Sequence, residues 1–283
     1  MTTTQKRIGL FLLLTLGASA VFYGFILATG HVGGGGGVYE LGLMWSPALA
    51  AILTCKLSGL PLAELGWNWG KSKWMWRAFL IPLLYTAIAY AAIWLLGFGQ
   101  FPDAKFVADT RASLGWTNAP DALVVGGYFL LIASAGMVLS LAFALGEEIG
   151  WRGFLSPHMT QALGFRTGAI VTGLIWAAWH LPLVLFADYN SAAPKWFAAI
   201  CLIVLLVAMS VIMAWLRLRS GSLWTGALFH ASHNQFIQVF FTPGTHATSA
   251  TTPYLIDEFG VALPVVVVLL AAFVWVRWKE PER

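Results

Sequence analysis

Charged side chains are scarce in this sequence. Only 16 basic and 12 acidic residues occur among 283, which is 10% of the chain, whereas an ordinary soluble domain has about 25%. A water-facing surface of this size needs many more charges, and their shortage leaves long uncharged runs. The scarcity excludes a soluble enzyme. Together with a hydrophobic content of 59%, it predicts a protein whose solvent is mostly lipid.

Cysteines, basic clusters and low-complexity segments are also nearly absent. Cys55 and Cys201 both lie in apolar runs, which suits neither a disulfide framework nor a thiolate metal site. The net charge is +4, but no cluster of five or more Lys and Arg residues exists, so we expect no nucleic-acid partner. The glycine run 33–37 is not followed by the Lys-Ser/Thr helix start of a phosphate-binding loop, so it is predicted to be a flexible outer turn.

Long apolar runs are what the sequence does contain. A transmembrane helix needs about 20 mostly apolar residues, and the runs lack the alternation of an outer-membrane barrel. We therefore expect an all-α polytopic membrane protein, with residues 1–283 forming a single integral membrane domain. Runs bounded by charge, proline or glycine predict about eight transmembrane helices: 8–29, 38–57, 75–97, 122–146, 166–187, 196–216, 222–241 and 260–278.

The first run has a second interpretation. Lys6 and Arg7, the apolar residues 8–17 and the small residues 18–20 together resemble a cleavable signal peptide. The apolar run continues to Ala28, however, which favours a retained first span.

The basic residues predict the orientation in the membrane. If the N-terminus is cytoplasmic, only Lys105, Arg111 and Lys195 fall on the outer side. Cytoplasmic loops of membrane proteins carry an excess of Lys and Arg, so we expect both termini in the cytoplasm and the chain in the cell (inner) membrane or its equivalent. The inner side then holds thirteen basic residues: Lys6, Arg7, Lys56, Lys71, Lys73, Arg77, Arg152, Arg166, Arg217, Arg219, Arg277, Lys279 and Arg283.

Ionisable residues are costly inside a span and are candidates for function. The fourth predicted span ends with Glu147 and Glu148, and Arg152 follows Glu148 at the i+4 spacing of a favourable ion pair. Glu147, rotated by about 100 degrees from Glu148, can face a different neighbour. An unpaired carboxylate beside apolar surface suits a general base. Alternatively, both acids simply end the helix at the headgroups, although acids do not suit the helix C-terminus.

Two further spans carry polar groups. His180 precedes Pro182, which predicts a kinked helix with free carbonyls at a cavity wall; the alternative is a buried histidine bonded to a carbonyl. His230 and Asn234 are four residues apart and share a helix face, with His233 on a neighbouring stripe. Two such donors suit one substrate oxygen, and the alternative is helix packing through hydrogen bonds.

One shared aqueous site explains these polar groups together better than several independent structural roles. The predicted depths of the two histidines in the membrane argue against one shared site. Counted from the cytoplasmic charges at about 1.5 Å per residue, His230 lies about 12 Å deep and His180 about 20 Å deep. The two would meet only if the fifth helix starts later than Arg166 or tilts strongly.

The polar groups form three motifs, each on its own predicted helix: Glu147-Glu148-x-x-x-Arg152, His180 and His230-x-x-x-Asn234. This order resembles the signature of the CPBP intramembrane protease family, which includes the type II CAAX prenyl endopeptidases and bacteriocin-processing or abortive-infection proteins. The catalytic motif region covers 147–234, and the eight-span layout extends the similarity to most of the chain. The family usually has Phe four residues before the lone histidine, where this chain has Trp176.

The resemblance implies peptide hydrolysis in a cavity open to the cytoplasmic side. Glu147 would activate a water that His180 helps to hold, and His230 with Asn234 would stabilise the oxyanion. Glu148 and Arg152 would support the helix end. The implied substrate is a membrane-associated peptide or protein in the lipid bilayer, with either a prenylated CAAX-type C-terminus or a leader peptide.

The resemblance equally implies a metalloprotease. Glu147, His180 and His230 would then bind Zn²⁺, with a water in the open fourth position. Two other functions compete: a non-catalytic immunity or scaffold protein, and a proton-coupled transporter. The first is disfavoured because no catalytic position is lost. The second is disfavoured because we find no repeat between residues 1–140 and 141–283.

Overall fold

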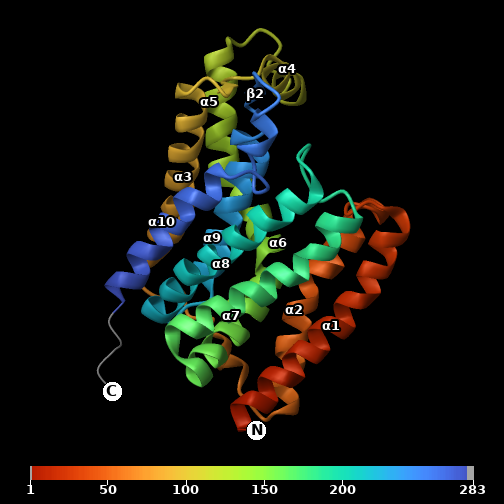
Figure 1. The fold of residues 1–283 in the computed structure, drawn as a ribbon, viewed down its shortest axis with the longest axis vertical. Helices are drawn as coiled ribbons and strands as arrows, with labels where there is room; N and C mark the ends of the chain where they lie inside the picture. The colour runs from red at the N-terminus through yellow and green to blue at the C-terminus, as the bar shows by residue number, and fades with distance from the viewer. Residues whose placement is uncertain (1, 279–283) are drawn as a thin grey trace.

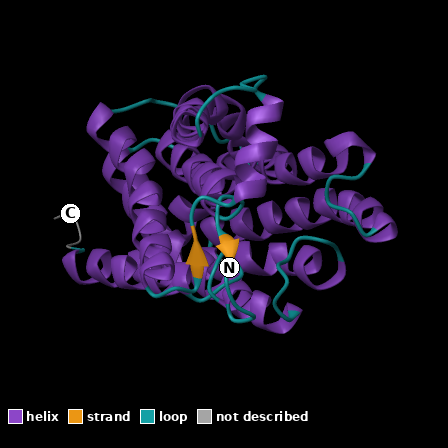
Figure 2. Cartoon of the chain, turned by 90° about the horizontal axis from the view of Figure 1, so that it is seen from above, coloured by secondary structure: helices purple, strands orange, loops and turns teal. Residues whose placement is uncertain are grey.

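The computed structural model describes residues 2–278, and the described chain is almost entirely helical (Figure 1). Its two-residue strands, β1 (Gly99–Gln100) and β2 (His246–Ala247), form one antiparallel pair (Figure 2). The helices are α1 Thr3–Thr29, α2 Val38–Leu57, α3 Ser72–Leu95, α4 Ala104–Ser113, α5 Asp121–Leu131, α6 Met137–Glu148, α7 Ser156–Phe186, α8 Lys195–Ser220, α9 Trp224–Asn234 and α10 Ala262–Arg277. Shorter elements are the 3-10 helices η1 Gly35–Gly37, η2 Leu62–Leu65 and η6 Thr252–Tyr254, and the π-helical turns η3 Ile132–Gly136, η4 Ile149–Leu155 and η5 Gln235–Phe241.

Five helical stretches of the described chain are long and apolar enough to cross a membrane, which confirms an all-α polytopic membrane protein. One stretch, Asp121–Phe186, has 66 residues and contains two of the predicted spans, with a break from helical geometry at Gly164 (φ 77°). Helices α9 and α10 have 11 and 16 residues, fewer than the about 20 that a span needs. The count of eight spans therefore stays a prediction.

Large apolar side chains cover the outside of the bundle. Leu16 on α1, Leu95 on α3 and Val276 on α10 expose 61%, 87% and 77% of their surface. A water-facing protein avoids broad apolar patches of this kind. The exposed surface therefore fits contact with lipid, and α8 is the more enclosed helix, with 72% of its most apolar window buried.

Two glycines bring α2 against the helix that carries the first motif. A Cβ on Gly146 would lie 2.7 Å from Cδ1 of Trp45, and a Cβ on Gly150 would lie 2.4 Å from Cβ of Pro47. Small residues four apart on one face let two helix backbones approach closely. This contact fixes the height of Glu147, which lies between the two glycines in the sequence.

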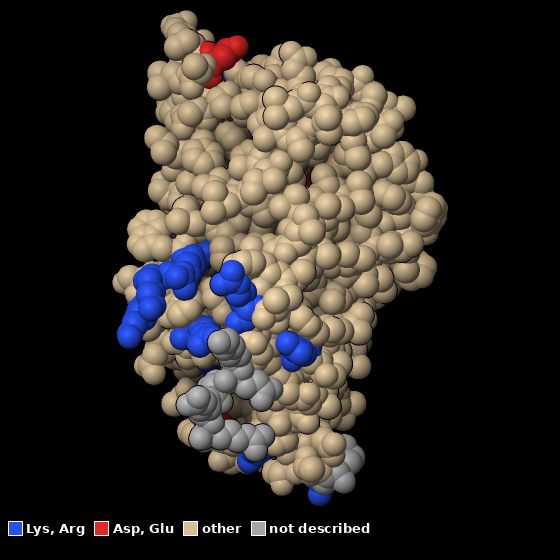
Figure 3. Space-filling model, turned by 60° about the vertical axis from the view of Figure 1, so that its left-hand side comes forward, with Lys and Arg blue, Asp and Glu red and all other residues tan. Residues whose placement is uncertain are grey.

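Both described ends of the chain lie at the same end of the bundle. Thr4 Oγ1 donates a hydrogen bond to Oε1 of Gln161 over 3.3 Å, and the ring of Trp278 stacks on Phe165 with centroids 4.0 Å apart. Figure 3 shows Lys and Arg side chains gathered on the lower part of one face and acidic side chains at the top. The prediction that both termini lie on one side of the membrane stays a prediction. Lys279 and Arg283, counted above among the inner basic residues, lie outside the described residues.

Candidate active site

A small cavity brings the predicted catalytic residues together. It has a volume of about 70 Å³ and is lined by side chains of α2, α6, α7, α9 and the loops 30–37 and 187–194. Glu147, His180, His230 and Asn234 all line it. The three motifs therefore contribute to one site.

The depth problem is resolved by the direction of α7. This helix runs obliquely across the bundle (Figure 1), so residues along it gain depth more slowly than 1.5 Å each. The ring of Trp176 lies 5.9 Å from the ring of His180 and 5.4 Å from the ring of His230, measured between centroids. The two histidines thus approach the same indole from different helices.

The carboxylate of Glu147 is buried and held by two indoles. Its Oε2 accepts hydrogen bonds from Nε1 of Trp176 over 2.8 Å and from Nε1 of Trp151 over 3.1 Å. As expected, no ion pair of the described chain involves this carboxylate, since Arg152 pairs with Glu148; the two indole hydrogen bonds were not foreseen. With Oε2 engaged twice, the carboxylate is fixed in one orientation, and Oε1 remains for a ligand in the cavity.

Glu148 and Arg152 form the expected ion pair, fully buried, with Nη1 to Oε1 at 2.9 Å. The same Oε1 contacts Nδ1 of His230 over 3.0 Å, so Glu148 connects the first motif to the third. The guanidinium of Arg152 also lies 4.1 Å from the centroid of the Trp176 ring. Gly226 permits this approach, since a Cβ there would lie 2.9 Å from Oε2 of Glu148.

The hydrogen-bond partners show which ring nitrogen of His180 and of His230 carries the proton. Nδ1 of His180 lies 3.0 Å from the carbonyl oxygen of Trp176; a carbonyl only accepts, so Nδ1 carries the proton and Nε2 of the neutral ring is an acceptor. Nδ1 of His230 donates to Glu148 in the same way. His230 can therefore donate a hydrogen bond through Nε2 only as the imidazolium, which the Glu148 carboxylate stabilises.

Wide π-helical turns accompany two of the motifs: one contains Arg152 of the first motif and the other follows the third motif. The turn η4 (Ile149–Leu155) begins after Glu148, and η5 (Gln235–Phe241) begins after Asn234. Single π-turns inside α-helices are frequent at functional sites. They change the direction of the side chains that follow, so the positions of Trp151 and Gln238 could not be read from an ideal helix.

A second buried network stands behind the cavity, and sequence reasoning missed it. Glu258 accepts hydrogen bonds from the hydroxyl of Tyr189 over 2.6 Å and from Nε2 of Gln238 over 2.7 Å, and contacts Nε2 of His233 over 3.1 Å. Burial alone would raise the pKa of Glu258, but His233, Tyr189 and Gln238 lower it to about 2.

Some of the missed residues had a signal and others did not. Gln238 lines the cavity four residues after Asn234, a spacing that could have been noticed. Tyr189 also lines the cavity, but it and Glu258 lie in connections between helices where no periodicity applies. Glu40, near the start of α2, is a third carboxylate at the cavity wall.

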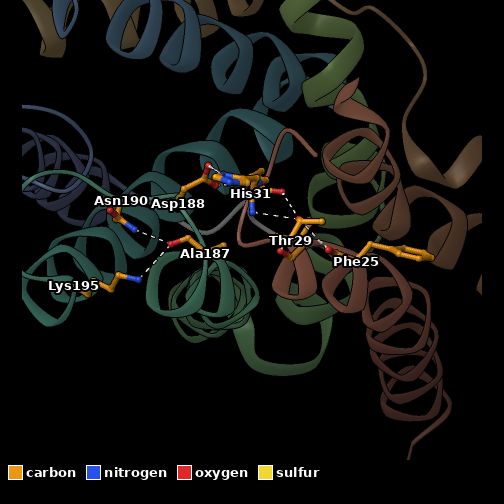
Figure 4. A network of polar contacts seen from close by, with 9 residues as sticks. Phe25, Thr29, His31, Ala187, Asp188, Asn190 and Lys195 are labelled. Atoms are coloured by element: carbon orange, nitrogen blue, oxygen red, sulfur yellow. Dashed lines mark hydrogen bonds and ion pairs between the residues drawn. The ribbon is translucent and has the colours of Figure 1, made fainter. Parts of the chain in front are cut away.

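The cavity lies beside two loops at the end of the bundle away from both chain ends. Oδ1 of Asp188 accepts a hydrogen bond from the backbone N–H of Val32 over 2.8 Å, and Oδ2 contacts Nδ1 of His31 over 3.1 Å (Figure 4). The Val32 N–H, with help from the His31 ring, holds the pKa of Asp188 below its ordinary value against the opposing effect of burial. Val32 and Tyr189 both line the cavity.

The cavity is bordered by loop 30–37 and loop 187–194, whereas both described chain ends lie at the opposite end of the bundle. The side of the membrane to which the cavity opens, and the side on which the termini lie, both stay predictions.

The residues proposed for Zn²⁺ do not gather as a metal site. Within residues 2–278, no three His, Cys, Asp or Glu side chains lie close enough together to hold a metal ion. The arrangement of Glu147, His180 and His230 therefore does not fit a three-ligand Zn²⁺ site.

Comparison with known proteins identifies the region that holds the motifs. Residues 128–236 match the family described as Type II CAAX prenyl endopeptidase Rce1-like. The chain is also 25% identical over 155 residues to CAAX prenyl protease 2 of Methanococcus maripaludis. That match covers 53% of this chain and 52% of the relative, so the chain spans about half the length of the curated relative it matches. These matches confirm the resemblance drawn from the three motifs: residues 128–236, which hold nearly all of the motif region, are similar to the Rce1-like type II CAAX prenyl endopeptidases.

Proposed function

We propose that this protein is an intramembrane endopeptidase that hydrolyses a peptide bond in a membrane-associated substrate. The observation that carries the proposal is the single cavity in which a carboxylate, two imidazoles and a carboxamide from three helices meet. Buried polar groups are costly unless they are paired or used. Helix packing alone gives no reason for Oε1 of Glu147 and Nε2 of both histidines to remain without protein partners in the described chain, while Oε2 and both Nδ1 atoms have them.

The proposed reaction uses these uncommitted atoms. Glu147 accepts a proton from a water that also donates a hydrogen bond to Nε2 of His180, and the resulting hydroxide attacks the carbonyl carbon. Nε2–H of the His230 imidazolium and the amide of Asn234 donate hydrogen bonds to the oxyanion. Glu147 then returns the proton to the leaving amide nitrogen, so one water is added across the broken C–N bond.

Glu148 and Arg152 act on this reaction through His230. The negative charge of Glu148 favours the doubly protonated ring that the oxyanion role needs. Arg152 balances Glu148 so that the buried charge does not stand alone. No step passes through a metal ion, because the donor set does not fit one.

The substrate follows from the side on which the cavity opens. The relative is named CAAX prenyl protease 2, and prenylated C-termini are exposed at the cytoplasmic leaflet. For this chain, the basic residues favour cytoplasmic termini, and the cavity then opens to the opposite side. We therefore favour a leader peptide or another translocated, membrane-anchored segment over a prenylated C-terminus.

Purified full-length protein in detergent tests the proposal. A defined mixture of synthetic peptides is incubated with the wild type and with Glu147→Gln, and new peptide ends are identified by mass spectrometry. We expect cleavage by the wild type and a rate lower by at least about 100-fold for Glu147→Gln, which keeps shape and hydrogen bonding but removes the base. Equal cleavage by a folded Glu147→Gln protein would refute the mechanism.

A further inference from the structure

Glu40 is a carboxylate of the cavity wall that the proposed reaction does not use. It lies in the first turn of α2, three residues after the N-cap Gly37, and its side chain makes no capping hydrogen bond. Among residues 2–278, no hydrogen bond or ion pair engages its carboxylate. Glu40 therefore presents a carboxylate without a partner among the described residues to the cavity, and a cation beside it would favour the ionised form.

The position of Glu40 places that carboxylate between Glu147 and loop 30–37. Met44, one turn further along α2, is level with the first motif, because a Cβ on Gly146 would lie 2.8 Å from the Met44 carbonyl oxygen. Glu40 is four residues, or about 6 Å, nearer to loop 30–37. An extended peptide rises about 3.3 Å per residue. A substrate residue one or two positions from the scissile bond can thus reach Glu40.

The cavity wall, as far as the structure describes it, carries carboxyl groups but no basic side chain other than histidine. Glu40 and Glu147 line it, and no Lys or Arg of the described chain does. Arg152 lies behind the wall, paired with Glu148 and facing the Trp176 ring. A narrow site with low-dielectric walls concentrates the field of such charges.

The cationic groups near the entry are already engaged. Nζ of Lys195 donates hydrogen bonds to the carbonyl oxygens of Leu185 and Ala187, and His31 contacts Asp188 (Figure 4). Neither side chain lines the cavity. A cation brought by the substrate would therefore be the missing partner of Glu40.

We propose that Glu40 is a specificity-determining residue that binds a Lys or Arg side chain of the substrate, one or two residues from the scissile bond. The inference rests on the proposed peptidase function and narrows its substrate class to peptides with a basic residue at that position. A purely structural Glu40, serving only the dipole of α2, would have no effect on the choice of substrate.

The test compares substrate preference rather than total activity. Purified wild type, Glu40→Gln, Glu40→Asp and Glu40→Lys are given a cleaved peptide in three forms, with Lys, Gln or Glu at each position beside the scissile bond. We expect the wild type to prefer Lys over Gln by about tenfold in kcat/KM at one position, mainly through KM. Glu40→Gln should lose this preference, Glu40→Asp should keep part of it, and Glu40→Lys should favour Glu.

Asp109→Asn is the matched control, because Asp109 is an exposed acid on α4, outside the cavity, and pairs with Lys105. It should keep the wild-type preference. An unchanged preference in a folded Glu40→Gln protein, or no preference for Lys in the wild type, would overturn the inference while leaving the peptidase function in place. If neither the wild type nor any variant cleaves a peptide, the proposed function fails and this inference falls with it.

Discussion

Nε1 of Trp176 donates a hydrogen bond to Oε2 of Glu147 over 2.8 Å, joining the second motif to the first. Trp151 donates to the same oxygen. A Phe, which the family usually has at the position of Trp176, offers an aromatic wall but no donor. Trp176 therefore both forms part of the cavity surroundings and orients Glu147, the proposed base.

Replacing Trp176 by Phe tests this orientation. The substitution keeps an aromatic ring beside Arg152 and removes the indole N–H. A hydrogen bond to a charged group contributes about 1.5–3 kcal/mol, so we expect kcat to fall by about 10-fold or more, measured on a cleaved peptide. Trp94→Phe is the control, since its indole bonds to Thr245 away from the cavity. Equal activity of the two variants would show that the Trp176 hydrogen bond is dispensable.

The ion pair of Glu148 and Arg152 predicts a stability effect. Both side chains are fully buried, so Arg152→Ala leaves a buried carboxylate without its cation, at a cost of about 3–5 kcal/mol. We expect a clearly lower melting temperature in detergent.

Lys105→Ala provides the comparison, because Lys105 and Asp109 form an exposed pair at the same i, i+4 spacing, and exposed pairs contribute little. Its melting temperature should stay close to that of the wild type. Identical melting of Arg152→Ala and Lys105→Ala would mean that Arg152 does not neutralise Glu148.

Local spacing in the sequence predicted part of the site. The i, i+4 relation of Glu148 and Arg152 gave their ion pair, because neighbours on one helix face are fixed by 3.6 residues per turn. The four predicted catalytic residues also meet in one cavity. Their roles remain predictions until activity is measured.

The rest of the site depends on relations that spacing does not encode. Trp176 reaches Glu147 across 29 residues of sequence, which requires the oblique course of α7 and the π-turn after Glu148. Tyr189 and Glu258 come from connecting segments whose folding over the cavity follows no period. The two loops that border the cavity, 30–37 and 187–194, could not be identified for the same reason.

Treatment with a metal chelator distinguishes hydrolysis by a water that Glu147 activates from hydrolysis by a zinc-bound water. Because Glu147, His180 and His230 do not gather as a metal site, we expect peptide cleavage to survive prolonged treatment with a zinc chelator. Metal content and activity are measured on the same sample. Loss of activity on chelation, restored by Zn²⁺, would assign the three residues as ligands instead.

Cysteine labelling can determine to which side of the membrane the cavity opens. Cys55 and Cys201 are buried, so an introduced surface cysteine can be followed with a membrane-impermeant maleimide on intact cells. Ala192→Cys lies in the loop beside the cavity and Ala162→Cys lies near the chain ends, and both positions are exposed. We expect labelling of Ala192→Cys alone, because the basic residues favour cytoplasmic termini. Labelling of Ala162→Cys alone would reverse the orientation and restore a cytoplasmic substrate.

The central claim is that Glu147 and His230 act as one catalytic unit, and a double-mutant cycle measures this directly. The kcat/KM of peptide cleavage is determined for Glu147→Gln, His230→Ala and the double variant, each checked for wild-type-like melting. Residues that act together are strongly non-additive, so the double variant should be little slower than the poorer single variant. Losses that multiply in the double variant would contradict a shared site.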